Sequence, residues 1–190
     1  MMDNPVDDEF KKILTVHPGT SWMYFVSKPR RERMLFESLR EQNVPAYLPL
    51  QQKTTEYSRR VYNRWLPMFS GYVFASTCRQ GFDIGKLNPS LLRVNFLSEP
   101  QGAELLEDLK IVRKFEVLSR QHKVEVCPRL APGTPVLIRK GEFKGDYAIV
   151  ERKKNGKSVI VNLHWVEMSL HVELPVDWVE EAGAAFRKES

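Results

Sequence analysis

The chain has few of the features that mark disulfide-rich, zinc-binding and membrane proteins. Only two cysteines, Cys78 and Cys127, occur among its 190 residues, and neither has a CxxC neighbour. This predicts free thiols and excludes a disulfide framework or a zinc site. No apolar run approaches the roughly 18 residues of a membrane span. The first residues are acidic, where a secretory signal is basic and then apolar. We therefore expect a cytoplasmic protein.

Catalytic motifs are also absent from the sequence. It contains no GxSxG motif and no glycine-rich loop of the kinds that cradle phosphates or dinucleotides. The histidines are scattered and do not have the HExxH spacing of metalloproteases: His17, His122, His164 and His171. We expect neither enzymatic activity nor a cofactor or bound metal.

What the chain does have is a local excess of positive charge. Between residues 21 and 70, nine basic side chains stand against four acidic ones, and this excess equals the net charge of +5 of the whole chain. Such a surface attracts phosphate groups, although a solvated face kept for solubility is the other interpretation. The basic residues are Lys28, Arg30, Arg31, Arg33, Arg40, Lys53, Arg59, Arg60 and Arg64.

Residues 21–118 show the pattern of an α+β domain with helices on an antiparallel sheet. Aromatic and β-branched residues predict buried strands, and the spacing of Leu105, Leu109 and Val112 predicts a helix. Pro29 suits the first position of an earlier helix because its missing N–H needs no partner there. The expected elements are a strand at 22–26, a helix at 29–43, an extended segment at 45–50, a hairpin at 54–65, a strand at 71–75, a short helix at 83–88, a strand at 91–97 and a helix at 102–118.

The rest of the chain divides into a linker and an all-β region. Charged residues and prolines fill residues 119–131, which favours a linker. From 132 to 182 short stretches alternate between apolar and polar residues, and we expect them to form a small barrel that leaves no sheet edge unpaired. Residues 1–20 and 183–190 are predicted tails.

Two segments resemble the NusG family of transcription elongation factors. In the first, the strand Trp22–Val26 is followed by the basic run Lys28–Glu32 and later by Leu66–Phe74, which contains Phe-Ser-Gly-Tyr-Val. This resembles the N-terminal (NGN) domain of the family, with Ser70 in the place of the usual proline. The second, Pro132–Tyr147, resembles a KOW motif through its Gly-x-Phe-x-Gly turn. The resemblance covers about 160 of the 190 residues.

The resemblance implies that the first domain binds the clamp helices of the largest RNA polymerase subunit. Aromatic residues would anchor the contact at low entropic cost. The residues that this implies are Trp22, Phe69, Gly71 and Tyr72, and the alternative for the three aromatic ones is that they are core. Period-2 alternation places Tyr72 and Phe74 on one face of their strand and Val73 on the other.

The same resemblance implies contact with upstream or non-template DNA. Tyr62 and Trp65 stand among basic residues, as expected of a surface that stacks on unpaired bases. The candidate nucleic-acid-binding residues are Lys28, Arg30, Arg31 and Arg33 before and within the first helix, and Arg59, Arg60 and Arg64 in the hairpin.

The last domain carries the candidate KOW residues Gly141, Phe143 and Gly145. Glycines here suit a tight turn, with Phe143 filling the barrel. The resemblance to the NusG family implies that the exposed tip contacts a ribosomal protein or Rho. We expect a monomeric transcription elongation or antitermination factor that suppresses pausing, and a specialised, operon-directed member of the family rather than its housekeeping one. The alternative is an RNA-binding or ribosome-associated KOW protein that does not act on polymerase.

Overall fold

The structure, a computed structural model, contains two compact units. It describes residues 12–57, 60–120, 124–128, 134–141, 144–145, 147–153, 156–163, 168–174 and 179–181. The first unit is formed by Met1–Leu50 and Leu66–Ile111, and the second by Gln51–Trp65 and Val112–Ser190.

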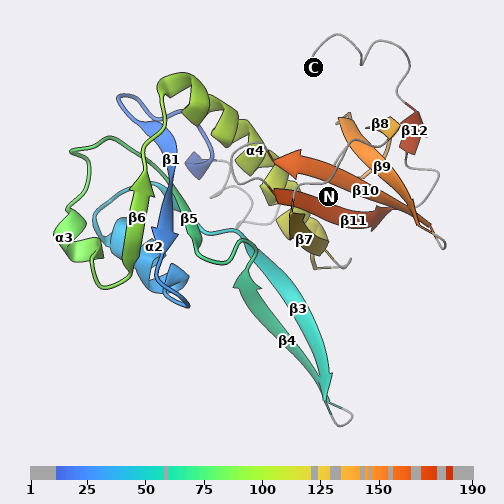
Figure 1. Cartoon of the computed structure of the whole chain (residues 1–190), viewed down its shortest axis with the longest axis horizontal. Helices are drawn as coiled ribbons and strands as arrows, with labels where there is room; N and C mark the ends of the chain where they lie inside the picture. Colours follow the sequence, from blue (N-terminus) through green and yellow to red (C-terminus); the bar gives the residue numbers. More distant parts are fainter. Residues whose placement is uncertain are drawn as a thin grey trace. The chain divides into compact units, whose positions relative to one another are not determined.

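An antiparallel sheet of four strands, in the order β2-β5-β1-β6, is the centre of the first unit (Figure 1). The two longest strands, β1 and β5, pair along their length in the middle. The sequence therefore predicted this sheet correctly from its aromatic and β-branched runs. The bounds are Ser21–Ser27 for β1, Ala46–Tyr47 for β2, Tyr72–Thr77 for β5 and Leu91–Asn95 for β6.

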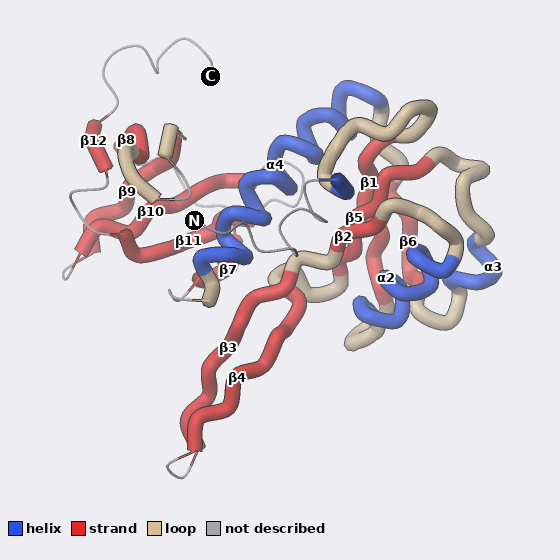
Figure 2. The backbone as a smooth tube through the Cα atoms, turned by 180° about the vertical axis from the view of Figure 1, so that it is seen from behind, coloured by secondary structure: helices blue, strands red, loops and turns tan. Residues whose placement is uncertain are grey.

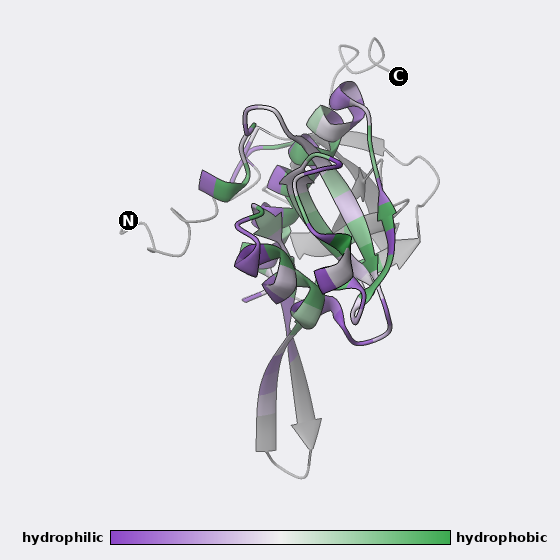
Figure 3. Ribbon diagram, turned by 90° about the vertical axis from the view of Figure 1, so that its left-hand side faces the viewer, coloured by the Kyte–Doolittle hydropathy of each residue, from purple (hydrophilic) through white to green (hydrophobic). Residues whose placement is uncertain are grey.

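Two helices, α2 (Glu32–Glu41) and α3 (Ile84–Leu87), contribute to the core on one face of this sheet (Figure 2). Every second residue of β1 points to that face, which places Met23 and Phe25 in the core. Hydrophobic residues, coloured green, are frequent along the strands of this sheet (Figure 3). The buried cluster consists of Met23, Phe25, Leu35, Leu39, Val44, Ala46, Leu48, Val73, Ala75, Leu87 and Leu91.

Helix α4 (Glu99–Leu118) starts three residues before its predicted beginning. Ser98 and Gln101 explain this start, because the Gln101 side chain accepts hydrogen bonds from both the amide and the hydroxyl of Ser98, each 2.9 Å long, as in a capping box. Gly102 then allows close packing on β1. A Cβ atom at Gly102 would meet the Ser21 hydroxyl and lie 2.9 Å from the carbonyl oxygen of Trp22.

The first predicted helix, at 29–43, is shorter than expected, and Pro29 does not begin it. Residues Lys28–Arg31 form a turn closed by a 3.0 Å hydrogen bond from the Arg31 amide to the Lys28 carbonyl. Arg30 in this turn has a φ of 60°, which is outside the right-handed helical region. The helix therefore begins only at Glu32.

The predicted hairpin forms a two-stranded ribbon of β3 (Leu50–Tyr57) and β4 (Arg60–Pro67) (Figure 1). In the second unit it contacts the end of α4. The Gln52 amide donates a 3.2 Å hydrogen bond to the Ser119 hydroxyl, and the Arg120 guanidinium lies 5.9 Å from the centroid of the Trp65 ring. These contacts fix the base of the ribbon.

The remaining strands form a second antiparallel sheet, in the order β12-β8-β9-β10-β11-β7. The first of them, β7, lies within 119–131, the range predicted to be a linker, and pairs Val126 with Leu170 of β11. The bounds are Val124–Pro128 for β7, Thr134–Ile138 for β8, Tyr147–Lys153 for β9, Gly156–Leu163 for β10, Met168–Leu174 for β11 and Val179–Glu181 for β12.

Candidate functional site

The candidate protein-binding surface lies on the sheet face opposite the buried cluster. Because Met23 and Phe25 point into that cluster, Tyr24 and Val26 point to the other face. Val26 pairs with Tyr72, which puts Tyr72 beside them. All three side chains are half-buried, and the rings of Tyr24 and Tyr72 have centroids 5.9 Å apart. We call Tyr24, Val26 and Tyr72 the tyrosine surface.

Two of the four residues proposed to bind polymerase are buried. Trp22 is 3% exposed, and its indole N–H donates a 2.9 Å hydrogen bond to the carbonyl of Thr15. Phe69 is 1% exposed and packs edge-on against Phe74, with ring centroids 6.1 Å apart. Their burial favours the core role, which the sequence left open beside an interface role.

Sequence reasoning missed Tyr24 and Val26 as members of this surface. The signal was present, since both alternate with the apolar residues Met23 and Phe25 in the same strand. Alternation separates the two faces of a strand but does not tell which face other elements cover. The family resemblance pointed to Trp22, which begins the aromatic run, rather than to Tyr24 two residues later.

The polypeptide enters the tyrosine surface through a tight turn at Phe69–Tyr72. The Tyr72 amide donates a 3.3 Å hydrogen bond to the Phe69 carbonyl. Gly71 has a φ of 85°, whereas Ser70 is not among the residues with positive φ. These features define a type II turn, in which glycine suits the third position and proline the second. Gly71, also predicted to bind polymerase, is therefore a turn residue whose backbone conformation leads into Tyr72.

Replacing Ser70 with proline should stabilise the first unit. Ser70 occupies the second turn position, where the fixed φ of proline fits, and among the described residues none accepts a hydrogen bond from its amide. The ring restricts the unfolded chain, so we expect the free energy of unfolding to rise by about 0.4–1 kcal/mol. Chemical denaturation of both proteins measures this difference. A decrease would show that the Ser70 amide or φ is needed as it is.

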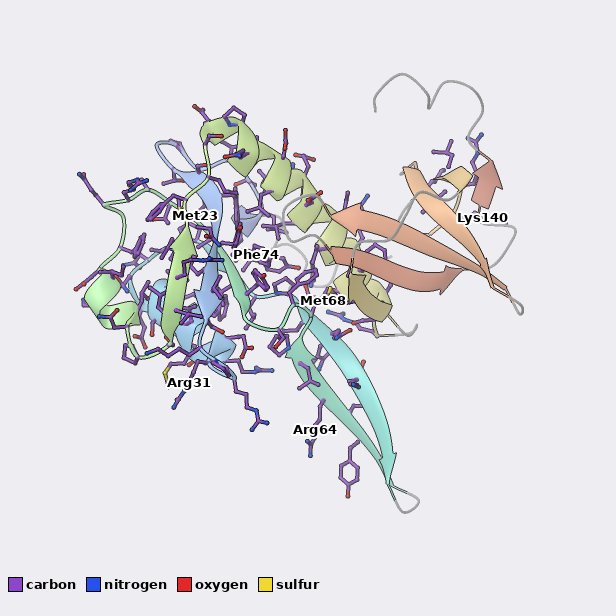
Figure 4. All side chains as sticks on the ribbon, viewed as in Figure 1. Met23, Arg31, Arg64, Met68, Phe74 and Lys140 are labelled. Atoms are coloured by element: carbon purple, nitrogen blue, oxygen red, sulfur yellow. The ribbon has the colours of Figure 1, made fainter. Side chains whose placement is uncertain are left out.

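The first group of predicted nucleic-acid-binding residues gathers at the turn before α2. All four side chains are exposed: Lys28, Arg30, Arg31 and Arg33. The Arg31 side chain extends away from the backbone of its turn (Figure 4). The Lys28 ammonium donates a 2.7 Å hydrogen bond to the Asn88 carbonyl, and Arg31 contacts the Met34 sulfur at 3.9 Å. Both bonds leave charge at the surface, so the turn presents a compact basic group.

The second group is only partly described. Arg64 in β4 is exposed, and its side chain extends away from the β3–β4 hairpin (Figure 4). Tyr62, two residues earlier, lies on the same side of the strand and is 44% exposed. Trp65 points to the other side, where it contacts Arg120. Arg60 begins β4, and Arg59 lies outside the described residues. An arginine and a tyrosine on one strand face can contact phosphate and stack on a base.

The predicted KOW turn has two glycines with the expected backbone conformation. Gly141 and Gly145 have φ values of 79° and 95°, which L-residues rarely adopt. The Gly145 amide donates a 2.8 Å hydrogen bond to the Ile138 carbonyl and so returns the turn to β8. Phe143 lies outside the described residues, so its predicted place in the barrel is not addressed by the structure.

Metal-binding clusters and membrane-spanning helices are both absent from the described ranges. No group of three or more histidine, cysteine, aspartate or glutamate side chains there is arranged to hold a metal ion. No helix in the same ranges combines the length and apolar composition needed to cross a membrane.

Comparison with known proteins identifies the first domain. Residues 20–96 match the family model of NusG, described as transcription termination factor nusG. This range contains the whole β2-β5-β1-β6 sheet, the tyrosine surface and the basic turn. Residues 20–96 therefore form a NusG-type N-terminal (NGN) domain. The match ends before α4 and does not include the second sheet.

Solved structures of NusG and Spt5 resemble the chain over most of its length. A structure titled for domain interaction in Thermotoga maritima NusG has 15% identity and a TM-score of 0.46, covering 85% of this chain and 97% of that one. Two conformations of an MjSpt4:Spt5 complex have 17% and 16% identity, with TM-scores of 0.25 and 0.26, and cover 85% of this chain and 96% and 97% of theirs. No curated protein matches the chain. The assignment therefore rests on residues 20–96.

Proposed function

We propose that this chain is a NusG-type transcription elongation factor that binds the clamp helices of the largest RNA polymerase subunit. The observation that carries the proposal is the family match at residues 20–96, within which Tyr24 and Tyr72 lie half-buried side by side on the two central strands of the sheet. Partly exposed tyrosines are typical anchors of protein interfaces. The factor would hold the clamp across the DNA channel, suppress pausing or termination and so favour long transcripts.

Helix-in-groove recognition suits the tyrosine surface physically. The amphipathic side of a partner helix buries aromatic rings against the sheet, and rigid aromatic side chains lose little conformational entropy when they bind. The phenol oxygens of Tyr24 and Tyr72 can keep a polar partner or water at the rim while the rings are buried. Gly71 and the buried Phe69 would then contribute by shaping the turn that leads into Tyr72.

The basic turn is proposed to contact upstream or non-template DNA beside the polymerase. The strained conformation of Arg30 supports this role, because a φ of 60° is a position that glycine would occupy without cost. Strained residues that persist are concentrated at functional sites. Arg64 and Tyr62 of the ribbon are proposed to form a second contact of the same kind.

Replacing Arg30 with glycine should raise stability and weaken nucleic-acid binding at the same time. Relief of the left-handed conformation should increase the free energy of unfolding by about 1 kcal/mol, and loss of one phosphate contact should reduce the slope of log affinity against log salt by about 1. Thermal unfolding and binding to a fluorescent forked DNA measure the two effects.

Asn43 provides the matched control for this prediction. It also has positive φ, at 58°, but no charge, so Asn43→Gly tests the backbone effect without removing a cation. Its salt slope should equal that of the wild type. If the slope of log affinity against log salt is also unchanged in Arg30→Gly, Arg30 does not contact phosphate, and the basic turn is only a solvated surface.

For the C-terminal region we propose a KOW-type barrel that recruits a second partner, a ribosomal protein or Rho. The support is the Gly-x-Phe-x-Gly pattern and the positive φ of Gly141 and Gly145. We also propose that the factor is a specialised member of the family, since Ser70 replaces the proline of the family motif. These proposals rest on the resemblance rather than on the family match.

A binding assay of the full chain with purified core polymerase tests the proposed function directly. We expect saturable binding to polymerase, and faster passage through a strong pause site in single-round transcription when the chain is added. Ribosomal subunits and ribosomal RNA are included as alternative targets. Binding to ribosomal components without any binding to polymerase would reject the proposal in favour of a ribosome-associated KOW protein.

A further inference from the structure

A buried carboxylate connects the first helix to the turn that leads into Tyr72. Glu32, the first residue of α2, is 7% exposed. Its Oε1 accepts a 2.9 Å hydrogen bond from the Gly71 amide. Buried carboxylates are rare unless they are paired.

The backbone of Gly71 is held on both sides of its Cα atom. Its amide donates to Glu32, and its carbonyl accepts a 2.8 Å hydrogen bond from the Ser27 amide at the end of β1. The turn lacks the proline that would fix φ at its second position, because Ser70 stands there. The conformation of Phe69–Tyr72 therefore depends on these bonds more than it would in a proline turn.

Glu32 also follows the basic turn directly in the chain. The Lys28–Arg31 turn ends where α2 begins, so the bond from Glu32 to Gly71 joins the basic turn to the tyrosine surface. A shift of the carboxylate would displace the Gly71 peptide and, one residue later, the start of β5 with Tyr72.

We propose that Glu32 is a positioning residue for polymerase binding: its carboxylate fixes the Phe69–Tyr72 turn and thereby the orientation of Tyr72. The inference rests on the proposed function, since it concerns the same surface. Glu32 does not itself touch the partner, because it is buried. It replaces, through a hydrogen bond, the rigidity that proline would give at position 70.

The ability of residue 32 to accept a hydrogen bond from the Gly71 amide sets the order of polymerase affinities expected among its variants. Glu32→Ala leaves the Gly71 amide without its acceptor, and the loss of a hydrogen bond to a charged group corresponds to about a tenfold loss of polymerase affinity. Glu32→Gln keeps a neutral acceptor oxygen of the same reach, so its affinity should lie between alanine and wild type. This conservative variant remains informative if Glu32→Ala does not fold.

Rescue by Ser70→Pro distinguishes positioning from general stabilisation. If Glu32 acts by fixing the turn, proline should restore most of the affinity that Glu32→Ala or Glu32→Gln loses, while changing the wild type by less than about twofold. Equal effects of proline in both backgrounds, or affinities that follow only the melting temperature, would overturn the proposal.

Amide hydrogen exchange provides a measurement that does not need polymerase. In Glu32→Ala and Glu32→Gln the Gly71 amide should exchange at least about tenfold faster than in the wild type, whereas the Phe25 amide in the centre of the sheet should be unchanged. Unchanged exchange at Gly71 would reject the role of Glu32 in the turn. Faster exchange together with no polymerase binding by the wild type would instead reject the proposed function and leave the role in the turn intact.

Discussion

Replacing Phe69 with alanine should lower the free energy of unfolding by about 3–5 kcal/mol, the range measured for buried phenylalanines. Phe69 is 1% exposed and packs edge-on against Phe74, which is equally buried. The substitution removes the ring from a site whose neighbours are held by the sheet, so the cavity can collapse only in part.

Native-state hydrogen exchange of the slowest β1 amides measures this effect, because it reports the opening of the sheet itself even if the two units unfold separately. Leu66→Ala is the matched control. It lies three residues earlier and is 40% exposed, so its effect should stay within about 0.5 kcal/mol. A loss below about 1 kcal/mol in Phe69→Ala, combined with lost polymerase binding, would restore Phe69 as a direct anchor.

Replacing Tyr72 with alanine should weaken polymerase binding by about thirtyfold or more. Truncation of a central aromatic anchor costs about 2 kcal/mol or more, and 1.4 kcal/mol corresponds to a factor of ten. Tyr72 is half-buried and contacts the ring of Tyr24. Part of its ring is therefore available to a partner, unlike the rings of Trp22 and Phe69.

Equilibrium titration of core polymerase with the full-length variants gives this affinity. Ile84→Ala is the control, since Ile84 is 55% exposed on α3, and that helix contributes to the buried cluster on the other face of the sheet. Its affinity should equal the wild type. A double-mutant cycle with Tyr24→Ala should show coupling, because the two rings touch. Wild-type affinity in Tyr72→Ala would place the interface elsewhere.

The local sequence pattern was sufficient to predict most of the strands and helices of the first domain. The aromatic and β-branched run at 22–26 became β1, and the leucine spacing from Leu105 to Leu109 marked α4. Both depend on periodicity, which the sequence carries within a few residues. The helix boundary at Pro29 failed because Arg30 adopts a left-handed turn, a conformation that a sequence does not predict for arginine.

The strand β7 shows a different limit of prediction from local sequence. Its residues, Val124–Pro128, stand among charges and prolines, so local composition favoured a linker. Their pairing with β11, more than forty residues later, supplies the backbone hydrogen bonds that local composition does not encode. The hydrogen bond between Glu32 and Gly71 also joins distant parts of the chain, and no local sequence feature near either residue predicts it.

The sequence by itself determined the class of the first domain, the succession of its strands and helices, and the two basic groups. These follow from periodicity, turn chemistry and charge, all of which are local. Only the tertiary structure decided which aromatic residues are core and which are half-exposed. Burial depends on which elements cover a face, and those elements come from distant parts of the chain. For this reason Trp22 and Tyr24, two residues apart in one strand, differ in their accessibility to a partner.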